Sequence, residues 1–212
     1  MNLDFAQLLS IFAVLLVSLT VHEAAHALSA DRLGDPTARA LGRLSLNPAV
    51  HVDPIGTILF PLVAMATNLP LIGWAKPVPV NPARLGRNWR QKFMMIAAAG
   101  PASNLALAVI AAVILRLVMA DYDTNGTGIS WRFAEVLARA IQLNVLLALF
   151  NMVPVPPLDG GNVLAGLLTG PMARTFDQLR PYGFLILYGL MLSGVLWTII
   201  TPPASLLLSW LL

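Results

Sequence analysis

Four long apolar runs, separated by shorter polar or proline-rich stretches, set the pattern of this chain. Each run is long enough for a helix that crosses a bilayer, which takes about 20 mostly apolar residues. Helix-breaking residues delimit the runs, with Gly34-Asp35-Pro36 after the first and Pro202-Pro203 after the last. The pattern therefore predicts membrane helices over about residues 5–33, 93–119, 133–152 and 182–200, with a polar loop over 121–130.

The stretch between the first two predicted helices does not fit a membrane span. Pro61 and Pro70 interrupt its apolar part, residues 55–72, which is also short for a crossing. Residues 73–82 carry prolines too closely spaced for a helix, so they are expected to be extended. A further short helix is expected after Gly160-Gly161.

These elements predict an all-α membrane protein. The expected fold is a polytopic helical bundle with a re-entrant or extended segment between the first and the next full span. We expect one membrane-embedded domain over residues 1–212, with a core of about 5–170 and an additional C-terminal span at about 181–201. Because no basic segment precedes the first apolar run, we expect a retained anchor, not a removed signal peptide.

Composition supports a membrane location. Of 212 residues, 58% are hydrophobic and 11% are charged, whereas about a quarter are charged in soluble domains. The absence of cysteine excludes disulfides and thiolate zinc sites. The sequence pI is near 9.8, but without a long basic run we expect no nucleic-acid partner and assign the basic residues to membrane topology.

Charge placement orients the helices. A basic cluster precedes the second predicted span and consists of Lys76, Arg84, Arg87, Arg90 and Lys92. Two aspartates, Asp121 and Asp123, follow that span. By the positive-inside rule the cluster is cytoplasmic, as are the residues after the first span. Residues 55–72 therefore enter and leave on the same side, which predicts a re-entrant hairpin packed in protein or lining a wet cavity.

The string His22-Glu23-Ala24-Ala25-His26 is the strongest chemical signal. Residues four apart share a helix face, so both imidazoles can bind one metal ion, and Glu23 beside them can take a proton from the attacking water. A charged group near the bilayer centre costs about 2.5–3.5 kcal/mol, so such residues rarely persist without a role. The alternative is a purely structural histidine pair.

A catalytic zinc site takes three protein ligands as a rule, so a third must come from elsewhere. His51 is one candidate. Asp159 is the better one, because prolines 154, 156 and 157 end the preceding helix and glycines 160 and 161 allow close backbone approach. The charge-based topology places Asp159 and His26 at the same membrane depth. The alternative role of Asp159 is an N-cap for the next helix.

The two motifs together resemble those of the site-2 protease family of intramembrane zinc metalloproteases. The second motif is Asn151-Met152-Val153-Pro154-Val155-Pro156-Pro157-Leu158-Asp159-Gly160, and Gly100-Pro101-Ala102-Ser103-Asn104 matches a further family string. The resemblance covers about residues 15–165 and implies one zinc ion on His22, His26 and Asp159. It also implies that Glu23 is the general base and that Asn151 lies near the substrate carbonyl or oxyanion. The alternative role of Asn151 is a C-cap of the helix that ends there.

Two more strings resemble those of small bacterial and archaeal members, namely His51-Val52-Asp53-Pro54 and Gly73-Trp74-Ala75-Lys76-Pro77. This implies a prokaryotic cell membrane as the location, and the charge-based topology places the active site towards the cytoplasm. No segment is long or polar enough for a PDZ or CBS regulatory domain.

The expected function is hydrolysis of peptide bonds in or near transmembrane segments of membrane-protein substrates. The alternative is a non-proteolytic zinc-binding scaffold or a metal permease. Because a helical substrate must be unwound, we expect the extended segment to receive its backbone by strand addition. The expected substrate-binding residues are Gly73, Lys76, Val78 and Val80.

Three polar sites receive secondary interpretations. Asn104 is expected to form a hydrogen bond across helices. His51 and Asp53 are expected to pair within a loop, and Asn125-Gly126 is interpreted as a turn.

Overall fold

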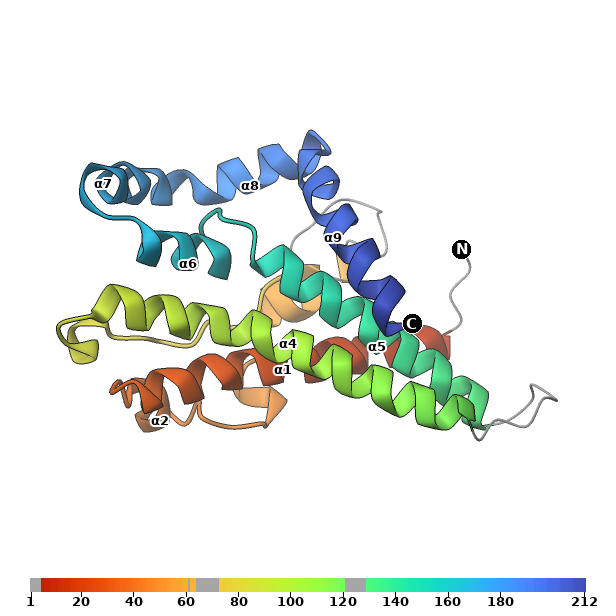
Figure 1. The fold of residues 1–212 in the computed structure, drawn as a ribbon. Coiled ribbons are helices and arrows are strands. Elements are labelled where there is room, and N and C mark those ends of the chain that lie inside the picture. The colour runs from red at the N-terminus through yellow and green to blue at the C-terminus, as the bar shows by residue number, and fades with distance from the viewer. Residues whose placement is uncertain (1–4, 61, 64–72, 121–128) are drawn as a thin grey trace.

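A computed structural model of the protein describes residues 5–60, 62–63, 73–120 and 129–212 (Figure 1). Within these residues it consists of helices and loops, with no strand. The predicted polar loop, the turn at Asn125 and most of the predicted re-entrant stretch lie outside the described residues. The all-α polytopic bundle is confirmed.

Three long helices form the body of the molecule: α1 (Phe5–Arg32), α4 (Trp89–Ala120) and α5 (Ile129–Asn151). Each contains a segment apolar and long enough to cross a membrane. Helix α4 packs against both α1 and α5 (Figure 1). It begins four residues before the predicted start, at Trp89, directly after the turn at Gly86. A left-handed φ of 75° at Gly86 ends the preceding short helix η3 (Pro82–Leu85) and lets α4 begin there.

Small side chains on α4 bring α5 close. Ala108, Ala111 and Ala112 pack against Leu137 and Ile141 in a buried cluster. Alanines let helix backbones approach closely, a common arrangement between membrane helices. The opposite face of α4 exposes large apolar side chains, which suits contact with lipid acyl chains.

Short elements connect α1 to α4. They are α2 (Thr37–Ala40), η1 (Pro48–Val50), the π-helical turn η2 (Pro54–Leu59) and η3. Residues 73–81 carry no regular secondary structure, which agrees with the prediction that this segment is not helical. The Trp74 N–H donates to the Gly56 carbonyl (3.1 Å), and the Thr57 hydroxyl donates to the Trp74 carbonyl (2.8 Å). These bonds attach the start of the segment to η2.

After α5 the chain folds back in short helices: α6 (Asp159–Leu167), α7 (Gly170–Leu179), η4 (Arg180–Tyr182), α8 (Gly183–Leu192) and α9 (Val195–Leu211). The prediction of one continuous helix over 182–200 is wrong. Gly194 has a left-handed φ of 78° and ends α8, and the α7–α8 segment meets α9 at a bend of 74°.

Helix α9 also continues through Pro202 and Pro203, which were expected to end the last helix. A proline removes one amide donor, and in a membrane helix neighbouring groups can compensate for that loss. Helix α9 packs against α5, so packing maintains it (Figure 1).

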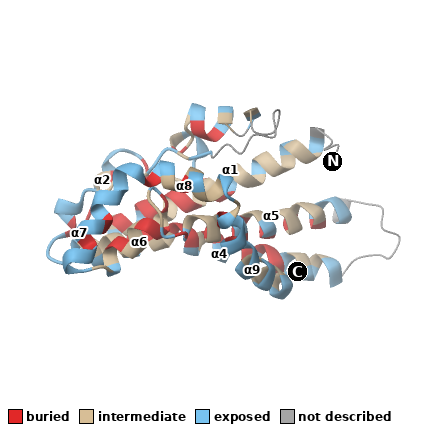
Figure 2. Ribbon diagram, turned by 90° about the horizontal axis from the view of Figure 1, so that it is seen from above, coloured by how far each residue is buried: buried red, intermediate tan, exposed pale blue. Residues whose placement is uncertain are grey.

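Buried residues gather where α1, α4 and α6 meet, whereas the other ends of α1, α4 and α5 are mostly exposed or intermediate (Figure 2). The buried region includes polar side chains such as His22, Glu23 and Asn104. The buried polar side chains of the three long helices therefore lie around the two histidines.

Candidate metal centre

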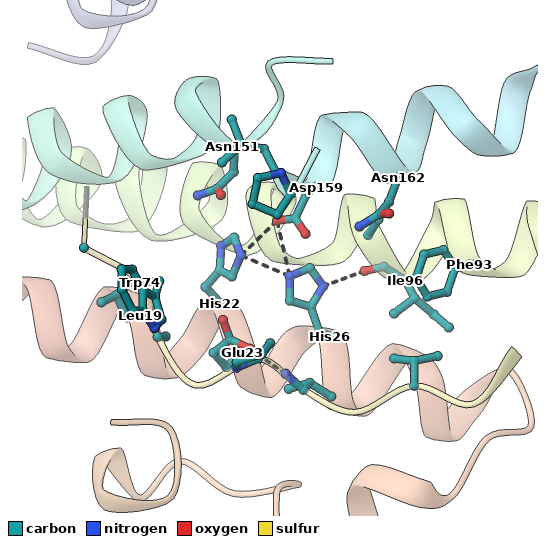
Figure 3. Close-up of a pocket in the computed structure, with 18 of the residues that line it drawn as sticks. Leu19, His22, Glu23, His26, Trp74, Phe93, Ile96, Asn151, Asp159 and Asn162 are labelled. Atoms are coloured by element: carbon teal, nitrogen blue, oxygen red, sulfur yellow. Dashed lines mark hydrogen bonds and ion pairs between the residues drawn. The ribbon is translucent and has the colours of Figure 1, made fainter. Parts of the chain in front are cut away.

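The three predicted metal ligands come together. His22 and His26 lie one turn apart on α1 with their Nε2 atoms 3.0 Å apart. The Oδ2 atom of Asp159, at the start of α6, lies 3.0 Å from His22 Nε2 and 3.3 Å from His26 Nε2. Figure 3 shows the three side chains converging from the two helices. In the described part of the chain, this is the one group of such residues arranged to hold a metal ion.

The arrangement of donor atoms in this group suits a bound cation. His26 Nδ1 lies 2.7 Å from the Ile96 carbonyl, which only accepts, so Nδ1 carries a proton, and in the neutral imidazole Nε2 then presents a lone pair. Asp159 Oδ2 is buried and has no hydrogen-bond donor. Acceptor atoms facing one another at about 3 Å repel unless a positive charge lies among them.

The spacing also suits zinc. Bonds of about 2.0–2.1 Å at a tetrahedral angle place two ligand atoms about 3.3 Å apart. The three observed distances of 3.0, 3.0 and 3.3 Å are close to this value. Nitrogen and carboxylate oxygen are donors that zinc accepts in catalytic sites with three protein ligands.

Gly100 on α4 makes the room for the two imidazoles. A Cβ atom at this position would lie 2.5 Å from His22 Nε2 and would also overlap His26 Nε2. A side chain at this position would therefore displace the two imidazoles. This explains the glycine of the Gly100-Pro101-Ala102-Ser103-Asn104 string in physical terms.

Glu23 lies beside the metal group without being part of it. Its Oε2 accepts a hydrogen bond from the Val78 N–H at 3.2 Å, so the carboxylate is attached to the extended segment (Figure 3). The side chain is buried, with 8% of its surface exposed. The Glu23 carboxylate thus lies between α1, which carries the two histidines, and the backbone of residues 73–81.

Asp159 does not cap α6. The N-cap position is Leu158, no side chain caps this helix, and Asp159 is its first residue. The cap interpretation is therefore wrong. The start of α6 lies close to the end of α5, because Gly160 packs directly against the Met152 backbone. A Cβ atom at Gly160 would overlap the Met152 carbonyl group. The short helix starts at Asp159, before the two glycines.

His51 is neither part of the metal group nor paired with Asp53. Its Nε2 lies 2.8 Å from the Ser45 carbonyl. Asp53 instead caps η2, accepting from the N–H groups of Ile55 and Gly56 at 3.0 and 2.8 Å. The expected pairing of His51 with Asp53 is wrong, because a loop carbonyl and a helix start supply their partners, and the less favoured alternative of His51 as third ligand has no support.

The metal group opens into a pocket of about 480 Å³. Asn151 lines it at the end of α5, and its Nδ2 donates to the Leu147 carbonyl of the same helix at 2.9 Å. Gly73, Val78 and Val80 also line the pocket. Lys76 does not; its N–H donates to the His51 carbonyl at 2.8 Å, and its side chain is exposed.

The sequence interpretation missed two polar residues near the centre, Ser18 on α1 and Asn144 on α5. Both are buried and join Asn104, whose Oδ1 lies 2.6 Å from His22 Nδ1. The predicted role of Asn104 as a bond across helices is confirmed. The signal for the other two was a polar side chain inside an apolar run, which is costly in a membrane unless partnered.

Comparison with known proteins identifies the family. The family model "Peptidase family M50" matches residues 116–193. YwhC of Bacillus subtilis, named as a candidate zinc metalloprotease, is 41% identical over 187 residues, or 86% of this chain and 82% of that protein. Rip2 of Mycolicibacterium smegmatis, named likewise, is 33% identical over 85% of this chain and 66% of its own length. No solved structure matches the chain. The chain thus belongs to peptidase family M50, the site-2 protease family, and is a multi-pass membrane zinc metalloprotease.

Proposed function

We propose that this protein is an intramembrane endopeptidase that cleaves membrane proteins in or near their transmembrane segments. The observation that carries the proposal is the convergence of three metal-donor atoms, with a carboxylate beside them, between helices that can span a membrane. Family membership supports peptide substrates, and the position of the site supports substrates that are themselves in the membrane.

In this proposal His22, His26 and Asp159 hold one Zn²⁺ ion. Zinc in such a site lowers the pKa of a bound water to about 7 and polarises the scissile carbonyl. The mutual distances of the three donor atoms, the unpartnered Asp159 oxygen and the gap opposite Gly100 all support this ligand set.

Glu23 acts as the general base in this proposal. It adjoins His22 in sequence, points to the same pocket and is not one of the three converging donors. It accepts a proton from the attacking water and passes it to the leaving amine, which keeps the reaction balanced. Asn151, which lines the pocket, is the proposed neighbour of the oxyanion.

Residues 73–80 are the proposed substrate-receiving segment. Gly73, Val78 and Val80 line the pocket, and the Val78 N–H bonds the proposed base, so this segment lies beside Glu23. An unwound substrate loses its own helical hydrogen bonds and can replace them with bonds to an extended segment. Lys76 contributes to this segment through its backbone N–H, which holds the segment to His51.

The proposed orientation puts the site towards the cytoplasm of a prokaryotic cell. The basic residues after α1 and at 76–92 belong to the connection between the end of α1 and the start of α4, so they lie at the same end of the bundle. The positive-inside rule assigns that end to the cytoplasm.

The test uses purified protein in liposomes with a single-span test protein, and compares the wild type with Glu23→Gln. Glutamine keeps the shape of the side chain and removes the base, so zinc content should stay and the cleavage rate should fall about a hundredfold or more. Mass spectrometry of the products locates the cleaved bond.

Two results would contradict the proposal. Unchanged turnover by Glu23→Gln would remove this residue from the mechanism. Cleavage confined to soluble regions far from the transmembrane segment would exclude an intramembrane substrate class.

A further inference from the structure

A chain of buried polar side chains connects the three long helices beside His22. Ser18 of α1, Asn104 of α4 and Asn144 of α5 are exposed by 1%, 0% and 2% of their surface. Polar groups buried among membrane helices are costly unless each finds a partner. Here the partners are one another, so the group forms a connected network.

The donors of the network follow one order, from His22 through Asn104 and Asn144 to Ser18. The Asn144 amide nitrogen donates to Ser18 Oγ and to the Ala140 carbonyl, each at 2.9 Å. The Asn104 amide nitrogen donates to Asn144 Oδ1 (2.8 Å) and to the Ser18 carbonyl (3.3 Å). Asn104 Oδ1 then remains as the acceptor for His22 Nδ1, at 2.6 Å.

Neither amide can turn over without losing its partners. If Asn104 turned, its oxygen would face the Ser18 carbonyl and Asn144 Oδ1, which only accept, and its nitrogen would face His22 Nδ1. If Asn144 turned, its oxygen would meet the Ala140 carbonyl, another pure acceptor. One arrangement therefore satisfies both amides, and it requires a proton on His22 Nδ1.

The two metal-facing histidines are thus fixed in different ways. His26 Nδ1 bonds the Ile96 carbonyl, whose position is set by the α4 backbone. His22 relies on a side-chain amide, which has two possible orientations. A histidine that binds metal through Nε2 needs its other nitrogen protonated and bonded to an acceptor.

We propose that Asn144 and Ser18 are positioning residues that act on the metal centre through Asn104. They hold the Asn104 amide with its oxygen towards His22, and this keeps the Nε2 lone pair of His22 available to zinc. The inference rests on the proposed metal site and adds to it residues that do not contact the metal group.

The test is a double-mutant cycle on purified zinc-loaded protein, read as zinc affinity in competition with a chelator. Asn104→Leu should weaken zinc binding about 10- to 100-fold, as removal of such outer partners does. Asn144→Leu should weaken it about tenfold in the wild-type background, and should have no further effect when Asn104 is already leucine. The visible spectrum of the Co²⁺-substituted protein should change in the same variants.

A matched control comes from the same helix. Thr20 is buried, and its hydroxyl donates to the Leu16 carbonyl at 2.7 Å, outside the network. Thr20→Val should therefore leave both zinc affinity and the Co²⁺ spectrum unchanged. Ser18→Ala removes only one hydroxyl, so it repeats the cycle if Asn144→Leu does not fold.

Equal effects of Asn144→Leu with and without the Asn104 side chain would overturn the proposal, because the residue would then act independently. So would unchanged zinc affinity in Asn144→Leu. Failure of the metal site itself gives a different result, since His22→Ala would then retain zinc.

Discussion

The replacement Gly100→Ala tests whether close approach of α4 to α1 is a condition for metal binding. The added Cβ would lie 2.5 Å from His22 Nε2 and would also overlap His26 Nε2. Ordinary contact between such atoms needs about 3.5 Å, so the helices or the imidazoles must separate by about 1 Å. Zinc–ligand distances tolerate only about 0.2 Å, so the three donors can no longer meet at one ion without strain.

The size of the loss in zinc affinity depends on how much of the strain is present only in the zinc-bound state. Overpacking of this kind costs about 1–3 kcal/mol. Without zinc the imidazoles can rotate away from the new methyl group, whereas with zinc they must stay, so the cost weakens binding. The expected loss of zinc affinity is therefore about 5- to 150-fold.

The assay is zinc retention against a chelator, together with thermal unfolding in detergent. Gly189→Ala on α8 is the matched control, because a Cβ there meets no atom within 4 Å. This control should keep its zinc, and alanine should favour its helix by about 1 kcal/mol. If Gly100→Ala bound zinc as tightly as the wild type, the room opposite the histidines would not be needed and this explanation of Gly100 would be refuted.

Three further predictions follow from the structure. Alanine at any of the three proposed ligands should remove zinc from the purified protein, whereas His51→Ala should retain it. If zinc analysis found that Asp159→Ala retains zinc and His51→Ala loses it, the ligand set would be refuted. A cysteine at Val78, in this cysteine-free chain, should crosslink to a substrate trapped on the Glu23→Gln variant, and a cysteine at Arg132 should not. Burial raises the pKa of Asp35, but hydrogen bonds from Thr37 and Asn81 outweigh it and leave that pKa lowered. Asp35 therefore stabilises the fold above its unfolded-state pKa, so the melting-temperature advantage over Asp35→Asn should shrink as the pH falls through its lowered folded-state pKa; an advantage independent of pH would contradict this.

Much of the metal centre could be predicted from sequence because it depends on short-range geometry. The fixed spacing of a helix brings His22 and His26 together, and the proline break before Asp159 marks where a helix must end. The long helices were predictable for the same reason, since each depends on its own apolar run.

The remaining features depend on packing between distant segments. Ser18 and Asn144 are 126 positions apart, and their contact depends on how α1 and α5 pack, which no local pattern encodes. The bend at Gly194 was hidden because the apolar run continues across it, and packing on α5 carries α9 past its prolines. His51 was misassigned because its partner is a backbone carbonyl, which every residue offers.

The extended segment before α4 has two unlike edges. Successive N–H groups of an extended chain point to opposite sides, and those of Trp74, Lys76 and Val78 all bond inward to the protein. The other side belongs to residues 75, 77 and 79, and two of these are prolines, which have no N–H. A second strand laid there would find carbonyls and at most one donor, so it must bring its own amides. Two copies of this edge cannot pair with each other, because each would supply almost only acceptors, and the segment is thereby protected from edge-to-edge association.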